Sequence, residues 1–293
     1  MTAASAEAFP LRPWIILMTG GALKSTMKAC RWVGQMYEIE MPEVSQEFVR
    51  CGQAAGRYLQ QQLQGSVHQW LKADLNPPFL EHLSFYLRTE LFFIRLRDVD
   101  GGLTMPGSDS GLLRIADGSN GHPCIMPMRH EHGGWAPAVS GWGLLDARTG
   151  LAVDPAALLN NERVEISDWE LHDLAVNYVR AHLEKAGRKL IARQTDPGVH
   201  PSIWFVGDSG PEWVVVRAVR YPRLHAAPPD LARWREMSEA NSRLGKVGYF
   251  ASVSVINSDE TFEPNAAALP LWRGFGMFAR FDGLVSPYSL EQA

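Results

Sequence analysis

Possible metal ligands lie close together near the middle of the chain, where Cys124 is followed by His130 and His132. Imidazole and thiolate groups suit zinc or copper, and histidines two residues apart point to the same side of a strand. Their spacing matches no common zinc finger, whereas Cys124, Met126 and Met128 alternate as the buried face of a strand does. We expect a core strand running into a polar turn, with a metal site at Cys124, His130 and His132 as the alternative.

Acidic residues of the second half are the next candidates for chemistry. Glu170, Asp196 and Glu212 could hold a divalent cation, because such ions prefer oxygen ligands, but only if their carboxylates converge to within about 2.0 to 2.6 Å of one ion. Ser167 and Glu170 also have the spacing of a capping box, in which each side chain accepts a backbone hydrogen bond at the start of a helix. If Glu170 acts only as a cap, Glu170→Ala costs about 0.5 to 2 kcal/mol of stability.

Basic residues could instead bind nucleic acid. Arg217 and Arg220 are the main candidates for contacts with phosphates, and Trp204 and Trp213 lie near them in sequence for stacking on bases. Residues three apart face opposite sides of a regular strand, so the two arginines do not form one strip. Tryptophans also commonly anchor cores and interfaces.

The first half combines helical and strand-like patterns. Apolar residues three and four apart predict a long helix over residues 43–75, with Gly65 as the candidate point for a break, and a short helical segment follows through Phe85. Residues 91–96 form a strand pattern, and residues 103–150 carry Gly, Pro and Trp with short strand-like runs. We expect an irregular α+β domain over residues 28–155, which resembles no family that we recognise.

The second half has clearer punctuation. Ser167 starts a helix that Gly187 ends. The pattern then predicts strands at 189–193, 202–206 and 212–221, a helix at 231–244, and strands at 249–256 and 271–281. Residues 207–211, Gly-Asp-Ser-Gly-Pro, are similar to the nucleophile segment of trypsin-like proteases, but no matching His segment precedes them, and we expect a hairpin turn. The fold class is therefore α+β, with a domain over residues 160–288 in the order α-β-β-β-α-β.

This order, with an acidic residue near the start of the first helix, resembles the core of the restriction-endonuclease-like, or PD-(D/E)XK, superfamily over about residues 162–285. The resemblance implies a divalent metal held by an Asp at the start of the second strand and by Glu-x-Lys on the third. Such a metal activates a water for phosphodiester hydrolysis.

The catalytic residues of that family are replaced here. The place of the Asp reads His200-Pro201-Ser202-Ile203, without a carboxylate, and Val215 and Arg217 stand at the places of the Glu and the Lys. Valine cannot bind a metal, and arginine stays protonated and cannot shuttle a proton. The resemblance thus implies a nuclease-like fold without its catalytic motif.

Composition excludes several classes of protein. The 293 residues carry 20% charged and 46% hydrophobic residues and a formal net charge of −4, which excludes a disordered chain and gives no electrostatic reason for tight non-specific binding to nucleic acid. Three cysteines without CxxC spacing, and no apolar run long enough for a signal peptide or a membrane span, predict a cytoplasmic protein with no membrane association.

These observations lead us to expect a non-catalytic binding or accessory protein without a cofactor, acting in a bacterial-type DNA, defence or mobile-element process. Its partner would be a protein or a nucleic acid. One alternative is an active nuclease with a displaced site of Glu170, Asp196 and Glu212, which would use Mg²⁺. The other is a protein-only adaptor or immunity factor.

Overall fold

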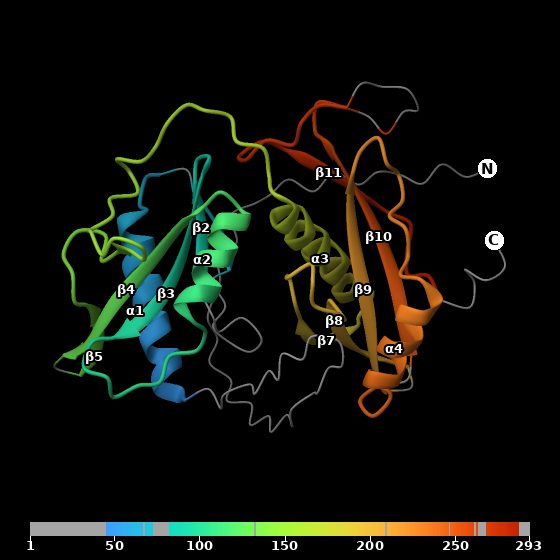
Figure 1. Cartoon of the computed structure of the whole chain (residues 1–293), viewed down its shortest axis with the longest axis horizontal. Helices are drawn as coiled ribbons and strands as arrows, with labels where there is room; N and C mark the ends of the chain where they lie inside the picture. Colours follow the sequence, from blue (N-terminus) through green and yellow to red (C-terminus); the bar gives the residue numbers. More distant parts are fainter. Residues whose placement is uncertain are drawn as a thin grey trace.

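The structure, a computed structural model, describes residues 45–66, 68–72, 82–131, 133–208, 210–245, 247–260, 262 and 268–286. Within these ranges it has the expected α+β fold, with four helices and two mixed sheets. Figure 1 shows the two sheets side by side, with helix α3 between them. We call residues 45–159 the first unit and residues 164–286 the second unit.

The first unit contains two helices and a six-stranded sheet. Its elements are α1 (Gln46–Gln62), β1 (His68–Lys72), β2 (Leu83–Leu87), β3 (Glu90–Asp98), α2 (Asp109–Gly118), β4 (His122–Glu131), β5 (Gly134–Pro137) and β6 (Leu145–Asp146). The sheet order is β1-β2-β3-β4-β5, and β6 also pairs with β4. Helix α1 packs on one face of this sheet and α2 on the other.

The second unit has the order of elements that the sequence predicts. It consists of α3 (Asp168–Lys185), β7 (Lys189–Arg193), β8 (Ile203–Gly207), β9 (Gly210–Arg220), α4 (Leu231–Asn241), β10 (Val247–Asn257) and β11 (Met277–Phe281). Its sheet order is β11-β10-β9-β8-β7. Helix α3 covers a core of aliphatic residues on one face, and α4 covers Trp213 and Val215 on the other.

The second unit repeats the topology of the first. In both, the first three strands pair antiparallel, a helix leads into a fourth strand parallel to the third, and a fifth strand pairs antiparallel with the fourth. The register also agrees: Trp70 pairs with Phe85 and Leu190 with Phe205, and each first strand is irregular at the next residue. Equivalent residues from α1 to β3 and from α3 to β9 therefore differ by 120 in number.

The same offset aligns the core positions of the first helices. Cys51, Ala55, Leu59 and Leu63 are buried in the first unit, and Leu171, Ala175, Val179 and Leu183 are buried in the second. Few residues are identical at this offset, although the cores match. Between residues 45–98 and 165–218 the identical pairs are Ala55/Ala175, Tyr58/Tyr178, Leu63/Leu183, Pro77/Pro197, Phe85/Phe205 and Arg97/Arg217.

Two helix predictions for the first half need correction. The helix expected over residues 43–75 is present as α1, and it ends at Gln62, just before Gly65 with its positive φ of 78°, near which we expected a break; beyond it, residues 68–72 form β1 in place of further helix. At its described end the short helix expected through Phe85 is replaced by β2, because the aromatic residues of Leu83–Leu87 pair with β3. Helix α2 was not predicted, since it spans one short stretch with glycine near both ends.

Candidate functional site

The segment at which the resemblance would place a catalytic Asp, residues 200–203, leads into β8. Ser202 precedes β8 and is buried. Its backbone N–H donates to the Val214 carbonyl at 2.8 Å, and its Oγ accepts from the backbone N–H of Val216 at 3.1 Å. The hydroxyl therefore fixes β8 against β9 and offers no ligand for a metal.

The other two positions of that comparison, Val215 and Arg217 on β9, have no side-chain oxygen to bind a metal. Val215 is fully buried beneath α4, in a cluster with Trp213 and Trp234. The guanidinium of Arg217 donates to the Ala227 carbonyl at 2.9 Å. Residues 202, 215 and 217 thus lie together at β8 and β9 without a carboxylate among them.

The three candidate carboxylates have separate local partners. Asp196 accepts from the backbone N–H of Gly198 at 2.8 Å. Glu212 is buried, and its carboxyl group packs directly against Gly207. A Cβ added at residue 207 would lie only 1.9 Å from the Cδ of Glu212. Glu170 accepts from the Ser167 N–H at 2.7 Å, which confirms the capping box. Throughout the described ranges no three His, Cys, Asp or Glu residues form a group that could hold a metal.

The alternating segment on β4 forms the core strand that we expected. Cys124, Met126 and Met128 are buried against α1, and burial raises the pKa of the Cys124 thiol to about 12. His130 lies at the surface, 3.7 Å from the Glu47 carboxylate, and six residues along β4, about 20 Å at roughly 3.3 Å per residue, separate it from Cys124. His132 lies outside the described residues.

The two candidate arginines for nucleic-acid contact lie on opposite faces of β9, as their spacing predicts. Arg217 lies on the side of α4. Arg220 lies at the start of α3, donates to the Ile166 carbonyl at 2.6 Å and pairs with Asp168. Trp213 is fully buried, so it cannot stack on a base. Each arginine already has an acceptor within the protein.

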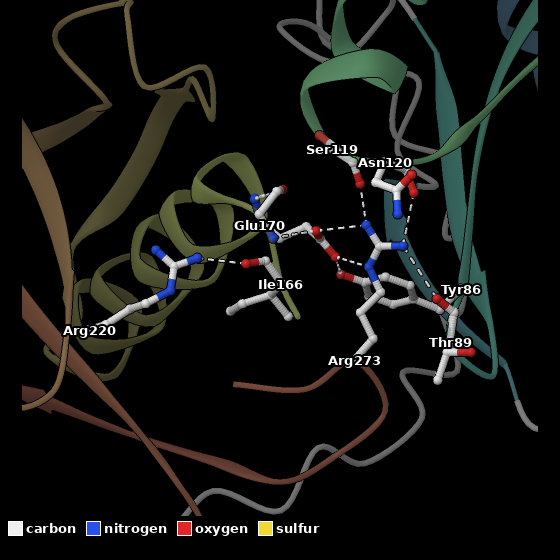
Figure 2. A network of polar contacts seen from close by, with 9 residues as sticks. Tyr86, Thr89, Ser119, Asn120, Ile166, Glu170, Arg220 and Arg273 are labelled. Atoms are coloured by element: carbon white, nitrogen blue, oxygen red, sulfur yellow. Dashed lines mark hydrogen bonds and ion pairs between the residues drawn. The ribbon is translucent and has the colours of Figure 1, made fainter. Parts of the chain in front are cut away.

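A polar network centred on Arg273 joins the two units (Figure 2). Arg273 comes from the connection between β10 and β11, and its side chain is 1% exposed. Its Nε and Nη2 donate to the two carboxylate oxygens of Glu170 at 2.8 and 2.9 Å. Its guanidinium also donates to three carbonyls of the first unit, those of Thr89, Ser119 and Asn120.

Glu170 therefore has more than the capping role that the sequence predicts. Besides Arg273 and the Ser167 N–H, it accepts a short hydrogen bond from the Tyr86 hydroxyl. Burial, together with the Glu170 carboxylate, holds the pKa of Tyr86 well above its ordinary value. Tyr86 is thus a hydrogen-bond donor at neutral pH, and the network is structural.

Apolar packing surrounds this network. Trp169 of α3 enters the core of the first unit, with its ring edge-on to Phe93 at 5.3 Å. The Lys72 ammonium lies 5.2 Å from the centre of the same ring. Helix α3 thus packs on its own sheet and also on the first unit, next to α2. The role of Arg273 could not be predicted from sequence: residue 273 falls in the strand expected over 271–281, whereas β11 begins only at Met277 and the segment before it is irregular.

Two histidines of the second unit are neutral at physiological pH. Burial, then the charge of His200, lower the pKa of His172 to about 4. Burial and the nearby Arg217 and Arg233 lower the pKa of His200 to about 4. The imidazoles therefore add no positive charge around Ser202 near pH 7.

A family model described as a domain of unknown function, DUF8840, matches residues 169–287, which is the second unit from α3 onward. No curated protein and no solved structure matches the chain. In the described part of the chain, every helix is too short or too polar to cross a membrane.

Proposed function

We propose that this chain is a non-catalytic, cytoplasmic binding protein whose partner is another protein, acting as an accessory factor in a bacterial-type DNA, defence or mobile-element process. The second unit would be a nuclease-like domain that has lost its chemistry. The observed order α-β-β-β-α-β supports the resemblance to the restriction-endonuclease-like superfamily. The process itself rests on that resemblance.

One observation carries the proposal. At the three places where the family holds its metal and its proton shuttle, this chain has a hydroxyl bonded into the sheet, a buried valine and an arginine bonded to a carbonyl. Metal-assisted hydrolysis needs oxygen ligands with an open position for water, and none of the three side chains supplies them.

A protein partner is favoured over nucleic acid for electrostatic reasons. Arg217 and Arg220 are both bonded within the molecule, and the chain carries a net charge of −4. Phosphate recognition requires several free cations, since it acts through release of counterions.

Binding of labelled single- and double-stranded DNA and RNA, measured by fluorescence anisotropy at 50 and 200 mM salt, tests the choice of partner. We expect no saturable binding at 200 mM salt. Saturable binding that weakens steeply with salt, and that Arg217→Ala reduces without unfolding the protein, would show that the partner is a nucleic acid.

A further inference from the structure

Because the two units share one topology, the surface of the first unit that binds α3 has an equivalent surface on the second unit. In the first unit, α3 docks on the sheet face that carries Tyr86 and Phe93 and beside the turn of Ser119 and Asn120. The offset of 120 residues places Val206 at the position of Tyr86, and Trp213 at the position of Phe93. The turn before β10, with Leu244, corresponds to the turn of Ser119 and Asn120.

Two of these three equivalent positions expose apolar residues, whereas Trp213 is fully buried against Trp234 of α4. Val206 and Leu244 are each 41% exposed, although both are large hydrophobic residues. Pro211 pairs with Val206 and is exposed too, whereas its equivalent in the first unit, Leu91, is buried beneath α3 and α2.

These residues form one continuous surface. A Cβ added at Gly245, next to Leu244, would lie 2.1 Å from the Pro211 carbonyl oxygen and 3.0 Å from the ring of Trp204. Trp204 and Val206 are two apart on β8 and so share a face. We call Trp204, Val206, Pro211 and Leu244 the apolar patch.

We propose that the apolar patch binds an amphipathic helix of a partner protein, in the way that the first unit binds α3. This inference rests on the proposed binding function and names the surface that performs it. In the first unit the Tyr86 hydroxyl donates to Glu170 of the docked helix. Val206 stands at the equivalent position and has no hydroxyl, so the bound helix presents apolar side chains there instead of a carboxylate. The exposed ion pair between Arg188 and Asp208 leaves the nearby rim without net charge.

Helix α1 of a second copy does not supply this helix. At the offset of 120, the residues of α1 that correspond to Trp169, Glu170 and Asp173 are Val49, Arg50 and Gln53. Helix α1 therefore lacks the aromatic anchor, and Arg50 is exposed and bonded to Glu47. The contact in which α3 docks on the first unit is therefore not repeated head-to-tail between α1 of one copy and the second unit of another.

A labelled peptide of residues 164–186, which contains α3, is a direct probe when it carries Glu170→Leu. Glu170 is the partner of the Tyr86 hydroxyl in the first unit, and a leucine suits Val206, the apolar residue at the equivalent position. We expect the full-length protein to bind this peptide saturably in an anisotropy titration. The same peptide with Glu170 retained should bind at least ten-fold more weakly.

Two variants of the protein locate the binding. Val206→Glu should weaken binding of the leucine peptide at least ten-fold, whereas Leu151→Glu, which charges an exposed leucine of the first unit, should leave it unchanged. Circular dichroism checks that both variants are folded. Absence of saturable binding, or an equal effect of both variants, would overturn the proposal.

Light scattering gives an independent check. A concentration-dependent dimer of the wild-type protein that Val206→Glu abolishes would mean that the apolar patch binds a second copy, and would also overturn the proposal. None of these experiments involves nucleic acid. The nucleic-acid binding experiment therefore tests the proposed function, and the peptide and light-scattering experiments test the apolar patch independently of it.

Discussion

At the scale of single residues, Arg273 has the largest set of partners in the described part of the molecule. Its charge is buried with that of Glu170, so the pair is stable only because the carboxylate and three carbonyls accept all of its donors. Breaking such a pair from one side leaves a buried charge without compensation.

Arg273→Ala should therefore lower the free energy of unfolding by about 3 to 5 kcal/mol in urea denaturation. The double variant Arg273→Met with Glu170→Gln removes both charges and should be more stable than Arg273→Ala alone. Arg280→Ala, which removes an exposed partner of Asp282, should cost less than about 1 kcal/mol. Equal losses in Arg273→Ala and Arg280→Ala would contradict the assigned role.

Glu170 shows why residue roles could be predicted only in part. The capping box followed from a local pattern of four residues, and it is present. The partners Arg273 and Tyr86 are distant in sequence, so no local pattern contains them. The expected cost of 0.5 to 2 kcal/mol for Glu170→Ala is accordingly too small, because it counts the cap and omits the ion pair.

His172 gives the protein a defined dependence on pH. Its pKa is about 4 when folded, against an ordinary value of 6.5, so between pH 6.5 and 4 the unfolded chain binds a proton that the folded chain does not. The free energy of unfolding should decrease as pH falls through this window, by on the order of 3 kcal/mol from this residue. Below pH 4 this contribution is fully lost.

Urea denaturation of wild type and His172→Gln at pH 7.5, 5.5 and 4 isolates this contribution as the difference between the two curves. The variant should lose less stability on acidification than the wild type does. Parallel curves would contradict the assigned shift of the His172 pKa.

At the scale of elements, α3 is the helix that packs against both units. It carries the core of the second unit on one side and Trp169 on the other. This double role explains why many of its residues are buried around the circumference of its first half.

Trp169→Ala should detach the units more than it unfolds either of them. Truncation of a buried tryptophan costs about 3 to 5 kcal/mol. We expect faster cleavage by trypsin at Arg148 and Arg163, which lie in the segment between the two sheets, with both sheets resistant. Trp204→Ala, also a tryptophan of the second unit but away from α3, serves as the control. Equal cleavage of the two variants would argue against a docking role for Trp169.

Most elements of the second unit could be predicted from sequence, because caps and β-branched runs mark its helices and strands. In the first unit, β1 and β2 could not, since their side chains continue a helical spacing and only pairing in the sheet decides their conformation. The repeat was hidden for a related reason. The buried positions keep their apolar character at the offset of 120 while their identities change, as between Ile94 and Val214.

At the scale of the whole molecule, the chain is two copies of one topology joined by a contact that uses different surfaces of each copy. Because the contact is head-to-tail, one unit has its docking face covered and the other has it exposed. This asymmetry supports the proposed binding function, and the side chains at Ser202, Val215 and Arg217 support the proposal that the second unit does not hydrolyse nucleic acid.

The most direct test of this account is incubation of the purified full-length protein with labelled DNA and RNA in Mg²⁺, in Mn²⁺ and in EDTA, followed by denaturing gels. We predict intact substrates under all three conditions, for the wild type and for Glu212→Ala alike. Cleavage that requires metal and disappears in Glu212→Ala would contradict the account and show that an active site has formed around a displaced carboxylate.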